Sequence, residues 1–468
     1  MGAMPREISI EDEFAHSVWC GNLDSTLFLW KYSLAKRGSL TRFRRSLREQ
    51  HLTASELDTL NWARTKELLH YVYAKVPFYQ NRFDSIGLHP SDIVAPEHYL
   101  QVPVLRKQEV RENLKTLISL DAKPGDLRLS TTGGSTGEPL GVYHEKRVAR
   151  AAMEWRMLLW WGLRPGLTYA SVYRQQFVTL RDRAGNWLMN WPGKRLHLDA
   201  SDLTPESMRT FLGSFAAHRP KLLHGYAGAI DRLAEFVLDE SIPLPPPKVV
   251  WVTSSPTTGV QRQRIEKAFG APVCDQYGCC EIYWLAAQCP VRQGLHMFTD
   301  ARRIEFLNAL GQPTPADEMG EIVITDLENS LFPLIRYAVG DYGRKLSSAC
   351  SCGVTLPLMG QVQGRVTDMV TSSTGRCVSG DFLTTVFDEY PEAIRRFQVY
   401  QHSDFRIELR VVPNPHFDRS EVVIEKVRRK IIDKFHGEVE VKTVHCPYIP
   451  DVRGKIRFVV SEVKRLAS

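Results

Sequence analysis

Apolar residues recur at every third or fourth position between residues 54 and 87, and this spacing predicts an N-terminal helical segment. The recurring positions are Leu57, Leu60, Ala63, Leu68, Leu69, Val72 and Tyr73. Pro77 interrupts the pattern, because a proline ring clashes with the preceding turn of a helix. Helices are also predicted over residues 148–162 and over the amphipathic stretch 420–435.

Short apolar runs punctuated by Gly and Pro predict strands at residues 248–253, 304–307 and 321–326. Because strands alternate with helices, we expect an α/β fold. The chain changes character around residues 360–365, after which short strands alternate with the single amphipathic helix. These later strands are predicted at residues 406–412, 438–444 and 456–460. The C-terminal part is therefore predicted to be a small α+β domain.

The composition is that of a globular protein. A chain of 468 residues is longer than one hydrophobic core usually supports, so two or three domains are expected. Because 43% of the residues are hydrophobic, each domain can bury a core. No apolar run is long enough to span a bilayer and no secretion signal is seen, so we expect a cytoplasmic protein whose first three residues resemble a tag scar. The net charge of +7 is spread along the chain, which argues against a nucleic-acid partner. Nine Cys without an export signal indicate reduced thiols or metal ligands rather than disulfides.

The segment from Ser130 to Leu140 reads STTGGSTGEPL and holds three Gly and five hydroxyl residues. Glycine lets backbone N–H groups approach phosphoryl oxygens, and the hydroxyls add donors without adding charge. The segment therefore predicts a loop that holds polyphosphate, although it matches neither a Walker A loop nor a G-x-G-x-x-G fingerprint. A flexible linker has a similar composition, so this segment alone leaves both interpretations open.

Four more segments follow the Gly-rich loop in a recognisable order. They are DQYGCCEI, LIRYAVGDYG, GRVTDMV and RGKIRFVV, and AKVPFYQNRF precedes them all. Together they resemble the adenylate-forming superfamily of acyl-CoA ligases, in the branch of phenylacetate-CoA ligases and capsule-biosynthesis adenylating proteins. The resemblance runs from about Leu60 to Val460. It implies an N-terminal extension (1–58), a large multi-sheet adenylating domain (59–363) and a small mobile C-terminal cap domain (364–468).

The resemblance implies that the Gly-rich loop closes over the phosphates of ATP, with Gly133 in place of the family's second-position Ser. The loop residues expected to bind ATP are Thr132, Gly134, Ser135, Thr136 and Gly137. Tyr277 and Gly278 fall where the family places an aromatic side chain near adenine. Asp341 falls where a carboxylate accepts hydrogen bonds from both ribose hydroxyls. Ser255 falls in an adenine-contacting loop in which relatives carry a Glu.

Three residues are expected to take part in catalysis. Glu281 matches the carboxylate that helps to hold Mg²⁺ on the phosphates, and Cys280 replaces the usual Thr before it. Arg365 of the hinge motif is expected to approach the ribose or a phosphate, with Thr367 replacing the first hinge Asp. Lys455 of the C-terminal Gly-Lys loop is expected to steady the attacking carboxylate and the charge on the α-phosphate.

A separate pattern combines one Cys, one His and a tight Cys-x-Cys turn, which is a complete tetrahedral set for structural Zn²⁺. Its members are Cys289, His296, Cys350 and Cys352. Similar cysteines occur in some members of the phenylacetate-CoA ligase branch. Buried free thiols beside a solvent-facing His are the alternative, and Cys279 and Cys280 are near enough in sequence to confuse the ligand set.

The implied reaction is attack of a small carboxylic acid on the α-phosphate of Mg-ATP, which gives an acyl-adenylate and pyrophosphate. Acyl transfer to the thiol of CoA or of a carrier protein follows, so the resemblance implies an acid–thiol ligase. Tyr226 and Trp155 are candidates to line the acyl pocket. Three alternatives stay open: AMP transfer to a cofactor or sugar, acyl transfer to an amine or hydroxyl acceptor, and a non-catalytic nucleotide-binding homologue.

Overall fold

A computed structural model describes most of the chain, and its side-chain description leaves out Thr131, Cys377 and residues 363–365. The described residues are 23–35, 38–131, 140–148, 150–174, 179–365, 370–374, 376–378, 383, 386–387, 390, 393–415, 417–449 and 458–463. No helix within these ranges has both the length and the apolar character needed to cross a membrane.

The predicted helical segment is α4 (Ala54–Lys75) and α5 (Pro77–Ser85), and two further helices that the periodicity did not predict come before it. These are α2 (Leu23–Ala35) and α3 (Ser39–Glu49). Thr53 begins α4 with a capping box, in which the Thr53 side chain accepts from the Glu56 N–H and the Glu56 carboxylate accepts from the Thr53 N–H. Val76 adopts an extended conformation ahead of Pro77, so the predicted segment is two helices rather than one.

Short elements lead to the Gly-rich loop. They are η2 (Pro90–Asp92), η3 (Pro96–Gln101), α6 (Lys107–Glu112), β1 (Leu127–Thr131) and β2 (Gly141–Glu145). The two strands pair antiparallel, with Thr131 opposite Gly141. Both ends of the loop are thus held by one hairpin, while residues 132–139 lie outside the described part.

The largest sheet has eight strands in the order β13-β9-β8-β7-β6-β5-β3-β4. The strands are β3 (Tyr169–Tyr173), β4 (Arg195–Asp199), β5 (Leu222–Tyr226), β6 (Val249–Thr253), β7 (Val273–Cys279), β8 (Tyr283–Ala287), β9 (Leu295–Met297) and β13 (Leu358–Met359). Strands β3 to β7 run parallel, whereas β7, β8, β9 and β13 pair antiparallel. Helices connect the parallel strands, as the alternating pattern predicted.

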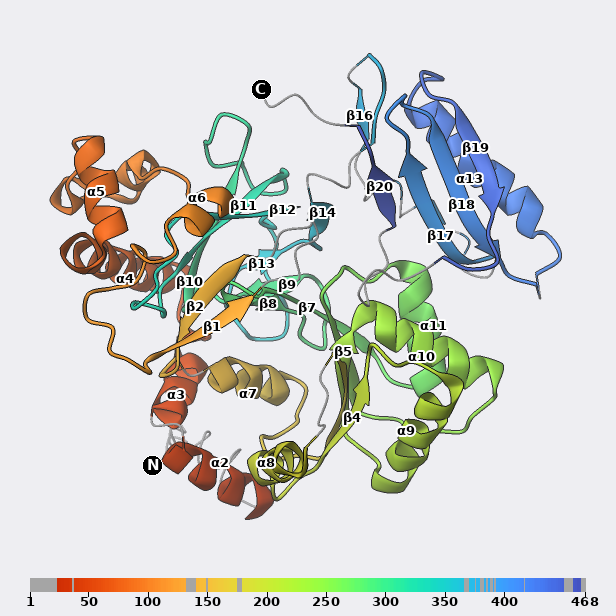
Figure 1. The fold of residues 1–468 in the computed structure, drawn as a ribbon, viewed down its shortest axis with the longest axis horizontal. Helices are drawn as coiled ribbons and strands as arrows, with labels where there is room; N and C mark the ends of the chain where they lie inside the picture. Colours follow the sequence, from red (N-terminus) through yellow and green to blue (C-terminus); the bar gives the residue numbers. More distant parts are fainter. Residues whose placement is uncertain are drawn as a thin grey trace, which may run out of the picture.

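Each face of this sheet has its own apolar core. One face packs against α9 (Pro205–His218), α10 (Ala227–Asp239) and α11 (Gly259–Phe269). The other face packs against α7 (Arg150–Trp160), behind which lie α2 and α3. Helix α8 (Leu180–Asn190) connects β3 to β4 (Figure 1). The N-terminal helices are therefore part of the core that supports the sheet.

A second, antiparallel sheet contains β10 (Arg302–Leu307), β11 (Gly320–Asp326), β12 (Tyr337–Gly343) and β14 (Gln363–Arg365), in that order. Its apolar residues share one core with α4, α5 and the β7–β9 end of the large sheet. The two sheets thus meet in the middle of the molecule (Figure 1).

The C-terminal part has a core of its own. It contains β15 (Val370–Thr371), β16 (Cys377–Val378), β17 (Ile394–Gln401), β18 (Ile407–Pro413), α13 (Ser420–Lys434), β19 (Val441–His445) and β20 (Val459–Ser461). Its main sheet has the order β19-β18-β17-β20. It lies beside α10 and α11 (Figure 1), where an Arg264 N–H donates to the carbonyl oxygen of Arg395 at 3.2 Å. The predicted fold class, a large multi-sheet α/β body with a small α+β domain, is confirmed.

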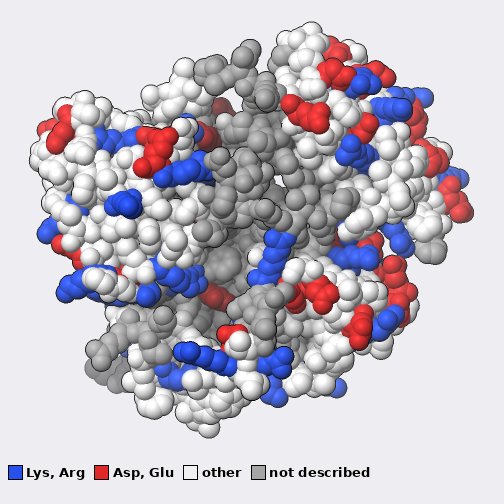
Figure 2. Space-filling view, in the orientation of Figure 1, with Lys and Arg blue, Asp and Glu red and all other residues white. Residues whose placement is uncertain are grey.

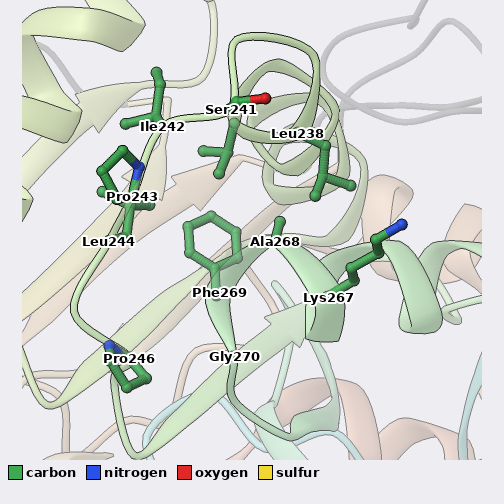
Figure 3. Close-up of a pocket in the computed structure, with 11 residues that line it drawn as sticks. Leu238, Ser241, Ile242, Pro243, Leu244, Pro246, Lys267, Ala268, Phe269 and Gly270 are labelled. Atoms are coloured by element: carbon green, nitrogen blue, oxygen red, sulfur yellow. The ribbon is translucent and has the colours of Figure 1, made fainter.

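A surface pocket at the ends of α10 and α11 is lined mainly by apolar side chains, among them Leu238, Pro243 and Phe269 (Figure 3). Both helices run antiparallel to the strands they follow, so this pocket lies at the amino ends of the parallel strands. Ligands of open α/β sheets bind at the opposite, carboxyl ends. The pocket is therefore remote from the motifs of interest.

Candidate active site

Two of the predicted nucleotide residues lie where the two central sheets meet. Tyr277 lies on β7 of the large sheet and Asp341 on β12 of the second sheet. The Tyr277 hydroxyl donates to Asp341 Oδ2 at 3.0 Å. Burial and the neighbouring Asp341 carboxylate raise the pKa of Tyr277 well above its usual value, so the hydroxyl stays protonated and remains a donor. Two motifs that are distant in sequence are thus directly linked.

Glu281 is held close to the same place. It is buried directly after β7, and the Tyr337 hydroxyl donates to its Oε1 at 3.0 Å. Burial, reinforced by Glu281, raises the pKa of Tyr337 far above its usual value, so Tyr337 also acts only as a donor. The carboxylate therefore has a fixed orientation. We did not anticipate the role of Tyr337, although its position in the motif of Asp341 was a usable signal.

The backbone of Arg365 completes this arrangement. Strand β14 pairs antiparallel with β12, and the register places Arg365 opposite Asp341. The hinge motif therefore reaches the residue expected to bind ribose. Arg336 belongs to the same motif as Asp341, but its side chain makes structural contacts elsewhere. It donates to Glu305 at 3.0 Å and to the Val102 carbonyl oxygen at 2.6 Å. It is buried and stabilises the body of the domain.

Gly278 is required by the close approach of β7 and β8. A Cβ atom at this position would lie 2.5 Å from the carbonyl oxygen of Tyr283, so another residue would force the two strands apart. The pairing register shifts at this point, between Tyr277 and Gly278. Ser255 lies half-buried in the turn that follows β6, at the same end of the sheet.

A contact between β2 and the tyrosine motif brings the hairpin of the Gly-rich loop to this region. His144 Nε2 donates to the carbonyl oxygen of Cys280 at 2.9 Å. The His144 ring stacks on Tyr283 with centroids 4.0 Å apart, and Arg150 lies 3.7 Å from the centroid of the same ring. Burial and Arg150 lower the pKa of His144 to about 4, so His144 is neutral near pH 7. The hairpin is thereby anchored next to Glu281.

The two candidate pocket residues lie in different surroundings. The Tyr226 ring is half-buried at the end of β5, with its centroid 4.9 Å from that of Tyr173. Trp155 is buried on α7 and contacts the rings of Phe28, Tyr32 and Phe43 edge-on. The structure thus places Tyr226 beside the tyrosine motif and Trp155 in the core with the N-terminal helices.

Five predicted loop residues and the predicted lysine lie outside the described residues. They are Thr132, Gly134, Ser135, Thr136, Gly137 and Lys455. Figure 2 shows Lys and Arg side chains along the rim of the hollow in the middle of the face that it draws.

The four predicted metal ligands come together at the far end of the large sheet. Their ligand atoms all lie within 4.8 Å of one another, and this group contains Cys289, His296, Cys350 and Cys352. Cys289 Sγ lies 3.5 Å from Cys350 Sγ, and Cys352 Sγ lies 3.3 Å from His296 Nε2. Thiolates around tetrahedral Zn²⁺, with Zn–S bonds of about 2.3 Å, lie roughly 3.8 Å apart. The cluster therefore has the dimensions of a zinc site.

The hydrogen bond made by the other ring nitrogen of His296 also fits a zinc site. His296 is buried, and its Nδ1 lies 3.0 Å from the carbonyl oxygen of Leu356, which makes Nδ1 the protonated nitrogen and leaves Nε2 to face the cysteines. Cys279 and Cys280 are not members of this group among the described residues.

Comparison of the sequence with known proteins finds relatives of the predicted kind. The CapK C-terminal domain model matches residues 370–462. A phenylacetate-coenzyme A ligase of Thermus thermophilus is 25% identical over 359 residues, which are 74% of this chain and 79% of that enzyme. Protein CapK of Staphylococcus aureus is 23% identical over 429 residues, or 88% and 90% of the two chains. These similarities support the predicted resemblance to the phenylacetate-CoA ligase branch of the adenylate-forming superfamily.

Solved structures show the same fold. 2-Hydroxyisobutyryl-CoA ligase in the postadenylation state, in complex with 2-HIB-AMP, superposes with a TM-score of 0.74 at 19% identity. The match covers 89% of this chain and 91% of the other. An open conformation of the same ligase with CoA gives a TM-score of 0.62. The likeness extends over both the large body and the C-terminal domain.

Proposed function

We propose that the protein is an ATP-dependent acid–thiol ligase. A carboxylate oxygen of the acid attacks the α-phosphorus of ATP, the bond to the β-phosphate breaks, and acyl-adenylate and pyrophosphate result. The thiol of CoA then attacks the acyl carbon and AMP leaves. The observation that carries the proposal is the convergence of Tyr277, Glu281, Asp341 and the backbone of Arg365 at one junction of two sheets. Consumption of ATP and CoA would place the protein in the cytoplasm.

The described residues suit the binding of the nucleoside. The Asp341 carboxylate accepts a hydrogen bond from Tyr277, and a carboxylate can accept several hydrogen bonds, as contact with both ribose hydroxyls requires. The Tyr277 ring lies beside it and would flank the adenine. Arg365, opposite Asp341 in the strand register, would reach the ribose or a phosphate. No side chain of the protein needs to act as a nucleophile, because positioning of the reactants and stabilisation of charge are sufficient for this chemistry.

Glu281 would hold Mg²⁺. Its orientation is fixed by Tyr337 through one oxygen, so the carboxylate can offer the other to a cation. Bound Mg²⁺ would neutralise charge on the phosphates of ATP. The hairpin β1–β2 brings the ends of the Gly-rich loop next to Glu281 through the contact of His144 with Cys280. Lys455 would neutralise charge that develops on the α-phosphate.

The cysteine–histidine cluster would hold a structural Zn²⁺. Cys289 and His296 flank the turn from β8 into β9, and Cys350 and Cys352 lie in the segment before β13. A closed four-ligand site would fasten these two segments at the edge of the large sheet. The role is structural, because the cluster uses all four positions of a tetrahedron and none is left for substrate.

Exchange of radiolabelled pyrophosphate into ATP tests the first step. Exchange should depend on one class of carboxylic acid, and Lys455→Ala should lower it by at least 10²-fold, as is typical for loss of a group that stabilises charge in a transition state. The matched control is Lys442→Ala, an exposed lysine on β19 of the same domain. Exchange that persists in Lys455→Ala would contradict the assignment of that lysine, and absence of exchange with every acid would contradict the ligase.

Mass spectrometry of the products with CoA separates the possible acceptors. An acyl-CoA thioester with free AMP supports the acid–thiol ligase. AMP retained on a cofactor or sugar, or an acyl group on an amine, hydroxyl or carrier-protein thiol, would identify one of the other acceptors.

A further inference from the structure

The face of the large sheet toward α7 becomes polar at the carboxyl ends of its parallel strands. Side chains alternate between the two faces of a strand. Val172, Leu223, Val250 and Val273 lie in the core on the α9–α11 side, so the residues one or three positions further along each strand point toward α7. The polar and aromatic members of that second set are Tyr173, His224, Trp251 and Gln276. This position is where an open α/β sheet binds its ligand.

His224 is the centre of this group. It is buried, and its Nε2 lies 2.5 Å from the Tyr173 hydroxyl. The Trp251 and Trp284 rings lie 5.6 and 5.9 Å from its ring, measured between centroids. Burial, together with Arg195, lowers the pKa of His224 to about 3, so the imidazole is neutral. It is a polar, uncharged group enclosed by aromatic walls.

Two neighbouring polar atoms have no hydrogen-bond partner within the described part of the chain. Trp251 is fully buried, and its Nε1 donor is unpaired. Gln276 is only 5% exposed, and no donor among the described residues has hydrogen-bond geometry toward its Oε1. Gln276 Nε2 lies 3.6 Å from Met157 Sδ, which places the amide against α7. An unpaired buried donor or acceptor costs about 1–3 kcal/mol, so a ligand that pairs with it gains that much.

Glu154 of α7 faces the same region. Burial raises the pKa of its carboxyl group, while Arg150 and Arg195 oppose that effect. Its carboxylate accepts no hydrogen bond from the residues that the structure describes. Its charge also affects Tyr169 and Tyr173, which places it over the face of β3 that these two side chains share. A half-buried carboxylate without a donor favours a ligand that supplies one.

Aromatic side chains join this polar group to the reaction centre. Tyr173 contacts both His224 and Tyr226, with ring centroids 5.0 and 4.9 Å apart. Tyr226 lies close enough to Cys280 for its pKa to be affected, and Cys280 directly precedes Glu281. An acid whose carboxylate lies at Glu281 would therefore extend past Tyr226 and Tyr173 and end at His224 and Glu154.

We propose that the acyl pocket selects acids that carry a hydrogen-bond-donating group, a hydroxyl or an ammonium, at the end remote from the reacting carboxylate. The proposal rests on the proposed ligase function. It assigns Tyr226 and Tyr173 to the walls of the pocket and Glu154, His224 and Gln276 to its polar end. A plain phenyl or alkyl end would leave the Glu154 carboxylate and Gln276 Oε1 without a donor, and such a mismatch strongly lowers kcat/KM for that acid.

Matched triplets of acids test the proposal in a hydroxylamine-trapping assay with the full chain and Mg-ATP. One triplet is hexanoate, 6-hydroxyhexanoate and 6-aminohexanoate, and the other is phenylacetate with its 4-hydroxy and 4-aminomethyl derivatives. We expect kcat/KM to be at least ten-fold higher for one substituted member than for the parent acid. The hydroxyl and ammonium arms show which donor is preferred. A parent acid that reacts as well as both derivatives would overturn the proposal while leaving the ligase function intact, whereas no trapping with any acid would overturn both.

Variants assign the preference to this group. Glu154→Gln keeps the shape of the side chain, and we expect it to lower kcat/KM for the preferred acid by 10- to 100-fold while the value for the parent acid changes less than two-fold. The parent acid also reports folding, because an unfolded variant loses activity toward every acid. Glu97→Gln, on an exposed residue of η3, should change neither value. An equal loss for all acids in Glu154→Gln would overturn the assignment, and the melting temperature of Glu154→Gln then decides whether the fold or the pocket was affected.

Discussion

The Tyr277 hydroxyl and the Asp341 carboxylate form a 3.0 Å hydrogen bond that crosses from one central sheet to the other. If Asp341 binds the ribose hydroxyls, this bond fixes the carboxylate before the nucleotide arrives. Such preorganisation lowers the cost of ordering the site on binding.

Asp341→Asn should therefore weaken ATP binding more than it slows chemistry. An amide accepts through one oxygen only and has no charge, and a hydrogen bond to a charged group contributes about 1.5–3 kcal/mol, so KM for ATP should rise roughly 10- to 100-fold. The rate at saturating ATP should fall much less. Initial-rate kinetics against ATP concentration measures both.

Asp58→Asn, on an exposed face of α4, is the control and should match the unmodified protein. An unchanged KM for ATP in Asp341→Asn would exclude Asp341 from the nucleotide site.

The cysteine–histidine cluster predicts about one zinc per chain by elemental analysis. Cys352→Ser should lose the metal, because one ligand of four is removed. If the closed site contributes about 2–3 kcal/mol, the melting temperature should fall by roughly 3–5 °C, and a strong chelator should have a similar effect on the unmodified protein. Cys446→Ser, a half-buried cysteine of the C-terminal domain, should retain zinc and stability. A metal-free protein of unchanged melting temperature would show that the cluster is four unligated side chains.

The sequence predicted the positions of helices and strands better than it predicted the contacts between them. Pro77 marked the break between α4 and α5, and the apolar runs marked β6, β10 and β11 within a few residues. The predicted strand over 438–444 begins only at Val441, because the Glu438 carboxylate accepts from Ser372 at 2.8 Å and belongs to the preceding turn. A contact across 66 residues of sequence cannot be derived from periodicity.

In the candidate site, too, the sequence predicted the motif residues but not the contacts between them. Motif order was enough to select Tyr277, Glu281 and Asp341 as members of one site. It could not show that Tyr337 orients Glu281 or that Arg336 is committed to Glu305, because both depend on which strands lie opposite each other. The polar group around His224 was missed for the same reason, since its members come from separate strands and a helix.

The contact between the large body and the C-terminal domain gives a third prediction. Arg396 of β17 lies 3.4 Å from Glu235 of α10, and both side chains are buried. Burial alone would raise the pKa of Glu235, but Arg396 and other nearby arginines outweigh it and lower the pKa, so the pair is charged. Residues in such direct contact couple by about 0.5–3 kcal/mol. A double-mutant cycle with Glu235→Gln and Arg396→Met, followed by urea unfolding, should therefore give a non-additive free energy of unfolding.

The same cycle on Arg209 and Glu240, an exposed pair 2.9 Å apart, is the control and should give a coupling below about 1 kcal/mol. Additive effects at Arg396 and Glu235 would show that this ion pair does not hold the C-terminal domain in place.

A last prediction concerns Asp300, which is buried between Arg156 and Arg42 with N–O distances of 2.9 and 3.2 Å. Burial alone would raise its pKa, but the two guanidinium groups outweigh burial and lower the pKa to about 2. A carboxyl group with a lower pKa in the folded state than the usual 3.8 stabilises the fold fully above that usual value. The stabilisation, about 2 kcal/mol, is lost as the pH falls from about 4 to about 2.

Asp300→Asn should therefore lower the free energy of unfolding at pH 7 by about 3–5 kcal/mol, because it leaves Arg156 and Arg42 buried without their shared partner. The difference from the unmodified protein should shrink as the pH is lowered through 4 toward 2, since protonation of Asp300 then removes the same charge. Denaturant unfolding at several pH values measures it, with Asp58→Asn as the exposed control. A difference that stays constant over this pH range would mean that the charge of Asp300 does not hold the α3–α7 contact together.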